Sequence, residues 1–140
     1  MKKVFIIGVI VFITALYAIA DDRAFYFALQ NCSSYNGSGH VNTEGMNVEF
    51  KNQIIGWEND KCVYKEYVNY AGLSACTTCK LSKNQINELV NVMRAYSTVQ
   101  EYSGEQLDTS SLSNVQNNPV VKVWSKYLQD SSVCTLELPN

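Results

Sequence analysis

Two cysteines, Cys76 and Cys79 in the segment ACTTCK, have the C-x-x-C spacing that thiol–disulfide oxidoreductases and metal sites both use. In an oxidoreductase the first cysteine of the pair lies at a helix N-terminus, where free backbone N–H groups and the helix dipole stabilise its thiolate. Here the next helix-start signal is at Ser82, beyond both thiols. Thiol–disulfide exchange at Cys76 and Cys79 is therefore the alternative hypothesis, and a structural role is the main one.

The remaining residues do not indicate a metal site, a cofactor site or a catalytic centre. Lys80 follows Cys79 at the position where covalent haem attachment requires a histidine. Zinc sites use four ligands, commonly in two paired spacings, and the other three cysteines are isolated in the sequence. The one histidine, His40, lies in a segment of turn-forming residues, with no nucleophile or orienting group beside it. We expect no catalytic residue, no metal and no cofactor.

The first 20 residues have the three parts of a secretory signal peptide. Lys2 and Lys3 form a basic head, an apolar stretch follows, and the small residues of AIA at 18–20 form a cleavage site before Asp21. Cleavage there leaves one domain over 21–140, in the periplasm or outside the cell. The apolar stretch is at the short limit of what spans a bilayer, so a retained anchor that tethers the domain to a membrane is a further alternative.

The net charge of the chain indicates which class of partner it can bind. Removing Lys2 and Lys3 with the signal peptide changes the formal net charge from −2 to −4. The remaining basic residues are scattered, whereas nucleic acid recognition needs a concentrated positive surface. We therefore expect another protein or a component of the cell envelope as the partner, and no nucleic acid. Contact with a membrane is expected only if the signal segment is retained.

All five cysteines follow the signal peptide, and in an oxidising compartment this number favours two disulfides and one leftover thiol. If the turn of the hairpin is centred on the NYAG segment at 69–72, Cys62 lies opposite Cys79. A turn centred on Asn69 would place Cys62 opposite Cys76 instead. We favour the first register, and with it a Cys62–Cys79 disulfide.

The second predicted disulfide joins the two ends of the mature domain. Cys32 ends the first predicted helix and Cys134 lies in the last predicted strand. Closing so long a loop contributes roughly 4.7 kcal/mol in the chain-entropy account of disulfides. Cys76 is then the leftover thiol.

The apolar pattern predicts a helix first and then strands. Helical spacing covers 21–32, and turn formers fill 33–40. From Thr43 the apolar residues alternate, which is typical of a strand with one buried face. Further strands are predicted at 53–57, 62–70 and 76–80.

Helices dominate the second half. Ser82 and Gln85 form an S-x-x-Q capping box, and Leu81 can pack on Ile86 across the start of that helix. A polar loop is predicted over 102–118. Pro119 then starts a helix whose apolar face comprises Val120, Val123, Trp124, Tyr127 and Leu128. The strand VCTLEL closes the chain. The order predicts an α+β domain: an antiparallel β-meander of three to five strands with helices packed on one face.

Aromatic residues suggest a binding face. Tyr64 and Tyr70 share one face of the strand 62–70, with Trp57 nearby in the sequence and Tyr67 on the opposite face. Aromatic side chains presented in this way can form contact surfaces for proteins or carbohydrates. Because tyrosine is favoured on half-buried strands, packing in and around the core is the main interpretation and the binding face is the alternative. The sequence therefore predicts a small exported, disulfide-stabilised protein that acts by binding and not by catalysis.

Overall fold

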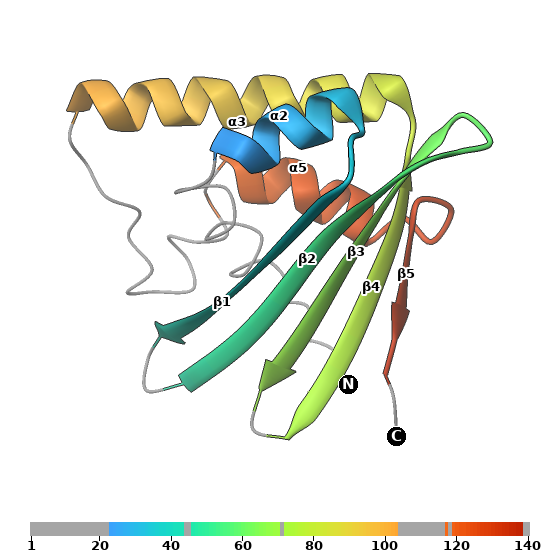
Figure 1. The fold of residues 1–140 in the computed structure, drawn as a ribbon. Coiled ribbons are helices and arrows are strands. Elements are labelled where there is room, and N and C mark those ends of the chain that lie inside the picture. The colour runs from blue at the N-terminus through green and yellow to red at the C-terminus, as the bar shows by residue number, and fades with distance from the viewer. Residues whose placement is uncertain (1–22, 44–45, 71, 104–116, 118, 139–140) are drawn as a thin grey trace.

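The computed structural model describes residues 23–43, 46–70, 72–103, 117 and 119–138 (Figure 1). The predicted signal peptide and most of the predicted loop at 102–118 lie outside these residues. Along the chain the elements are α2 (Arg23–Asn31), β1 (Tyr35–Thr43), β2 (Met46–Glu58), β3 (Lys61–Tyr70), β4 (Leu73–Leu81), α3 (Lys83–Ser103), α5 (Pro119–Leu128) and β5 (Cys134–Glu137).

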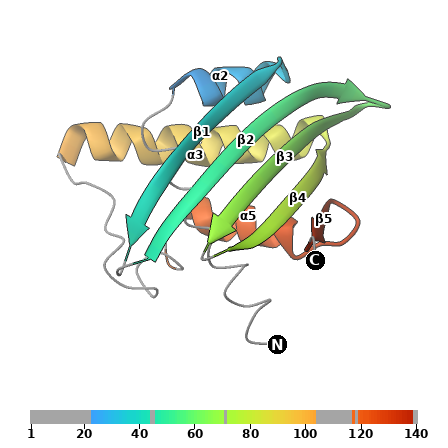
Figure 2. The same cartoon turned by 60° about the horizontal axis from the view of Figure 1, so that its bottom comes forward.

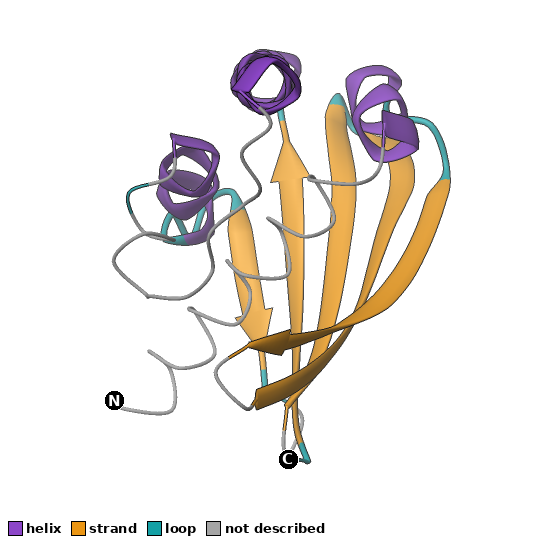
Figure 3. Cartoon of the chain, turned by 90° about the vertical axis from the view of Figure 1, so that its left-hand side faces the viewer, coloured by secondary structure: helices purple, strands orange, loops and turns teal. Residues whose placement is uncertain are grey.

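The strands form one antiparallel sheet in the order β1-β2-β3-β4-β5, so each strand pairs with its neighbours in the sequence. The described helices α2, α3 and α5 all lie on one side of this sheet (Figures 1 and 3). In Figure 2 the strands lie in front of α3 and α5, with the other face of the sheet towards the viewer. The predicted α+β meander with helices on one face is confirmed.

The core fills the space between the helices and the sheet. Tyr64 of β3 lies at its centre, 1% exposed, with its ring 5.4 Å from Trp124 of α5 and 5.9 Å from Phe25 of α2. Edge-on and tilted contacts of this kind are favourable for aromatic rings. The buried residues of α5 are Val120, Val121, Trp124 and Tyr127. Val121 was not on the predicted apolar face, and it is buried because neighbouring elements flank α5.

Strand β1 corrects a prediction. The segment 33–40 was expected to be a turn because of its glycine, serine and asparagine, but Tyr35–Thr43 is a strand paired with β2. The glycines serve packing: a Cβ on Gly37 would lie 2.5 Å from Asn52 Oδ1, and one on Gly39 would lie 2.9 Å from the Phe50 ring. Glycine within a strand commonly marks such a close approach.

Strand β2 is a single long strand where two shorter ones were predicted. It runs without interruption over Met46–Glu58, and its pairing with β3 shifts between Ile54 and Gly56. Gly56 has φ of +130°, a conformation that residues with a Cβ rarely adopt. This shift is a β-bulge: one extra residue in β2 bends the strand, while both halves of β2 stay paired with β3.

The start of α3 agrees with its sequence signal. The Gln85 backbone N–H donates to Ser82 Oγ at 3.2 Å, and the Ser82 N–H donates to Gln85 Oε1 at 2.8 Å. Leu81 and Ile86, the predicted apolar contact across this start, are both buried. The capping box is therefore formed, and it fixes where β4 passes into α3.

The disulfide pairing predicted from the sequence is wrong. The bonds are Cys32–Cys62 and Cys79–Cys134. Tyr70 pairs with Leu73, so the β3–β4 turn lies further along the chain than predicted. This moves the register by two residues and places Leu81, not Cys79, opposite Cys62.

The observed partners come from elements that the sequence does not place next to one another. Cys79 lies directly opposite Cys134 in the β4–β5 pairing, with the two Cα atoms 4.1 Å apart. Cys62 lies on the helix-covered face, where the end of α2 brings the Cα of Cys32 to 5.8 Å. Two disulfides are typical of proteins that mature in an oxidising compartment.

Candidate functional site

The structure separates the two cysteines of the C-x-x-C segment. Both belong to β4, and because side chains alternate along a strand, Cys76 and Cys79 point to opposite faces of the sheet. Cys79 is fully buried and bonded to Cys134, whereas Cys76 is a free thiol of intermediate exposure. Three residues of strand span roughly 10 Å, which is too far for a disulfide between the two sulfurs. The arrangement gives no support to a dithiol active site at these residues.

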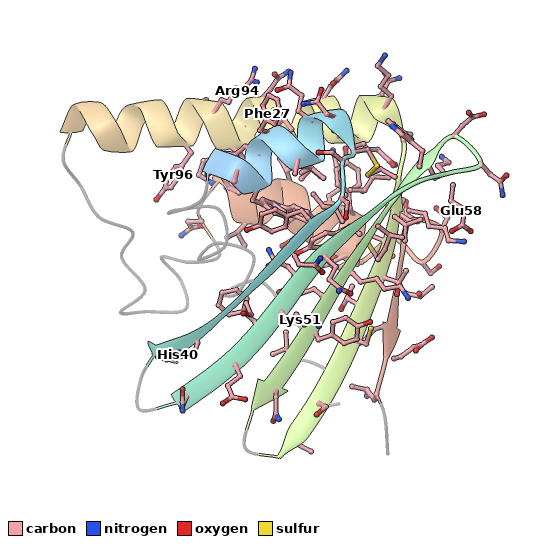
Figure 4. All side chains as sticks on the ribbon, in the orientation of Figure 1. Phe27, His40, Lys51, Glu58, Arg94 and Tyr96 are labelled. Atoms are coloured by element: carbon pink, nitrogen blue, oxygen red, sulfur yellow. A yellow bond between two sulfur atoms is a disulfide. The ribbon has the colours of Figure 1, made fainter. Side chains whose placement is uncertain are left out.

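His40 lies in an ordered strand and not in the loop that was predicted. It is exposed near one end of β1, opposite Glu49 of β2 (Figure 4). Within the described part of the chain, no group of three or more His, Cys, Asp and Glu side chains is arranged to hold a metal ion.

Of the three residues considered for an aromatic binding face, Tyr64 lies in the core. It is 1% exposed, as the main interpretation of the sequence expects, and cannot contribute to a binding surface. Trp57 is 50% exposed but pairs with Cys62 near the tip of the β2–β3 hairpin, on the side of the sheet that carries the helices. The side chain of Tyr70 lies outside the described side chains. The exposed tyrosine of this strand is Tyr67, on the opposite face.

Tyr67 is part of a row of side chains that crosses the helix-free face, by which we mean the face of the sheet opposite α2, α3 and α5. The register places Lys51 of β2, Tyr67 of β3, Cys76 of β4 and Glu137 of β5 side by side in that order. Directly opposed residues on neighbouring strands have Cβ atoms roughly 5 Å apart. The free thiol therefore lies between an aromatic ring and a carboxylate.

A groove of about 720 Å³ runs over this row. Its floor follows β4, where the side chains on the helix-free face are small: Ser74, Cys76 and Thr78. Longer side chains border it, with Lys65 and Tyr67 on β3 and Glu137 on β5. The groove thus results from the size pattern along three paired strands. Its volume is within the range that ligand sites occupy.

The lining of the groove contains two lysines as well as Glu49 and Glu137. Lys51 and Lys65 are diagonal neighbours across β2 and β3, because Lys51 pairs with Tyr67. Neither forms an ion pair with another described residue, whereas Lys80, further along β4, lies 3.8 Å from Glu58. In Figure 4 Lys51 lies midway along β2. Both ammonium groups are thus available to an anionic ligand.

The opposite face of the same strands holds buried polar groups. Asn52, Glu66 and Thr77 are neighbours in one row across β2, β3 and β4, and each is at most 3% exposed. The Tyr64 hydroxyl donates a hydrogen bond to Glu66 Oε2 at 3.0 Å. Burial and, after it, the charge of Glu66 raise the pKa of Tyr64 well above its ordinary value of 10.0. At neutral pH the phenol is therefore the hydrogen-bond donor.

No family model, no curated protein and no solved structure matches this chain. In the described residues, no helix is long and apolar enough to cross a membrane.

The sequence held part of the signal for the groove. Alternation along β3 already separated Tyr67 from Tyr64, but the pattern did not show which of the two faces the helices cover. The lysines could not be linked to Cys76 either, since Lys51 and Lys65 become its neighbours only through the registers of β2, β3 and β4.

Proposed function

We propose that this chain is a small exported protein without catalytic activity that binds another protein through the helix-free face of its sheet. One observation carries the proposal: the groove at Cys76 lies on the face that no described helix covers, with an exposed aromatic ring and two lysines at its border. Exposed surfaces with concave shape and aromatic side chains are common contact sites between proteins.

The other face of the sheet supports this role because it is rigidly held. Cys32–Cys62 ties α2 to β3, and Cys79–Cys134 ties β4 to β5. Both links lie in the core, on the side of the sheet opposite to the groove. A surface that is fixed before it binds loses less conformational entropy in the complex, which favours affinity.

Export is supported by two independent features. The chain begins with a basic head, an apolar stretch and a small-residue cleavage site at 18–20, as in a secretory signal peptide. Two disulfides form most readily in an oxidising compartment. N-terminal sequencing of the exported protein is expected to begin at Asp21; a sequence that begins at the initiator would favour the membrane-tethered form.

The free thiol provides a test of binding in the cell. A membrane-impermeant maleimide is added to an unfractionated suspension of EDTA-treated cells that export the protein and, separately, to the purified mature domain. Cys76 is expected to react in the purified domain and to be protected in the cell suspension, because a partner covers the groove. A Cys76→Ser, Lys122→Cys variant is the control, since Lys122 is exposed on α5 in the helical layer.

Each outcome of this test decides a separate point. If the control cysteine reacts in the cell suspension but Cys76 reacts there as fast as in the purified domain, no partner covers the groove and the binding proposal is wrong. If the control cysteine does not react in the cell suspension, the protein is not exported. Protection of Cys76 alone supports both parts of the proposal.

A further inference from the structure

We infer that the groove on the helix-free face binds a short acidic segment of the partner in extended conformation, with its two acidic residues separated by one residue. This inference rests on the proposed function and specifies the chemistry of the ligand. It is carried by the positions of Lys51 and Lys65, by the extent of the groove and by the two glutamates in its lining.

The spacing of the lysines sets the spacing of the acids. Lys51 and Lys65 are diagonal neighbours on adjacent strands, so their Cβ atoms lie roughly 7 Å apart. In an extended peptide, residues i and i+2 point to the same side and are also roughly 7 Å apart. An acid-x-acid segment can therefore place one carboxylate at each ammonium group. Neither lysine has an acidic partner among the described residues.

The groove has room for an extended segment. Its lining includes Ser74, Cys76 and Thr78, alternate residues of β4, and it is open to solvent. Tyr67, 39% exposed, stands beside Cys76 at the middle of the floor. Its ring can pack against an apolar side chain next to the acids, as aromatic residues do at the centres of protein interfaces.

Two glutamates in the lining limit how much negative charge the groove accepts. Glu49 lies two residues before Lys51 on β2, and Glu137 of β5 pairs with Cys76. A long polyanion that passed Lys51 and Lys65 would meet these carboxylates, and like charges in contact weaken binding. The net charge of −4 expected after cleavage of the signal peptide also opposes nonspecific binding of polyanions. A short segment with two acids meets the lysines and avoids the glutamates.

A displayed library of random octapeptides tests the inference on the purified mature domain. The wild-type domain is expected to enrich peptides with acid-x-acid spacing, and these peptides should slow alkylation of Cys76. A Lys51→Glu, Lys65→Glu variant should bind them about tenfold or more weakly, as expected when two exposed charge pairs become repulsive. A Lys83→Glu, Lys122→Glu variant has the same net charge but is changed only in the helical layer, and it should bind them like the wild type.

The possible results separate this inference from the proposed function. If both lysine-reversed and wild-type domains enrich the same peptides, and these still protect Cys76, the groove binds peptides but the charge rule is wrong. If peptides are not enriched while inorganic phosphate or glutarate protects Cys76, the groove is a small-anion site and the inference is wrong. If nothing protects Cys76 in vitro, the inference is also wrong, and protection of Cys76 in the cell suspension decides the proposed function separately.

Discussion

Tyr67 and Cys76 are direct cross-strand partners on the helix-free face, and three residues along each strand Tyr64 and Cys79 are direct partners on the other face. The same pair of residue types is thus used twice between β3 and β4. One pair is fully buried, and Cys79 is bonded to Cys134. The other pair borders an open groove and keeps its thiol. This arrangement separates a structural pair from a functional candidate within one hairpin.

The thiol chemistry of the folded protein should follow this division. We expect one cysteine per mature chain, Cys76, to react with iodoacetamide without reductant. Peptide mapping under non-reducing conditions should yield the linked pairs Cys32–Cys62 and Cys79–Cys134. A Cys62–Cys79 or Cys76–Cys79 link in freshly purified protein would contradict the structure.

The two tyrosines should differ in their effect on stability. Tyr64→Phe removes the donor to the buried Glu66 carboxylate and should lower the free energy of unfolding by about 1–3 kcal/mol. Tyr67→Phe, at an exposed position of the same strand, should change it by less than about 0.5 kcal/mol. Urea unfolding at neutral pH measures both values. Equal losses for the two variants would show that Tyr64 is not in the core.

The disulfides should each contribute substantially to stability. The loops closed by Cys32–Cys62 and Cys79–Cys134 span 30 and 55 residues. In the chain-entropy account these loops correspond to about 3.6 and about 4.2 kcal/mol. Replacing Cys79 and Cys134 by alanine should therefore lower the free energy of unfolding slightly more than replacing Cys32 and Cys62. Cys76→Ala should have little effect. A large loss for Cys76→Ala would contradict the assignment of its thiol to the surface.

The β1 glycine at position 37 should not tolerate a side chain. Gly37→Ala places a Cβ 2.5 Å from Asn52 Oδ1 and 2.8 Å from the Tyr35 hydroxyl, so one of these buried or half-buried groups must move. Overpacking of this kind typically costs about 1–3 kcal/mol. Ser38→Ala, at the next and exposed position, is the matched control and should be nearly neutral. Thermal unfolding of the two variants provides the comparison.

Stability should fall at acid pH in part through Glu88 of α3. Hydrogen bonds from Lys126 and Tyr127 of α5 lower the pKa of Glu88 from its ordinary value of 4.5. A lowered pKa in the folded state means that the stabilisation is present above the ordinary value and is lost as the pH falls through the folded-state value. Because the pair is exposed, the effect should stay below about 1 kcal/mol.

A Glu88→Gln variant isolates this contribution. Its urea midpoint should be lower than that of the wild type at pH 7, and the difference should shrink as the pH falls below the ordinary value and Glu88 becomes protonated. High salt should reduce the difference at pH 7, since exposed pairs are screened. A difference that grows on acidification would refute the assigned contacts between α3 and α5.

The sequence by itself determined the features that depend on residues close along the chain. The capping box of Ser82 and Gln85, the strand alternation in β3 and the start of α5 at Pro119 each arise from interactions within a few residues. Such patterns act locally, so they can be recognised without knowing the rest of the fold, and together they were enough for the α+β class.

Only the tertiary structure decided the features that depend on which strands and helices meet. Cys62 bonds to Cys32 because the end of α2 packs beside it, while the β3–β4 register, which no local signal sets, places Leu81 and not Cys79 opposite it. Position 37 of β1 holds a glycine because Tyr35 and Asn52 fill the space where a Cβ would be. The groove at Cys76 is left open because the helices cover the opposite face. The physical reason is common to all three: the free energy that selects each arrangement comes from packing between segments far apart in the chain.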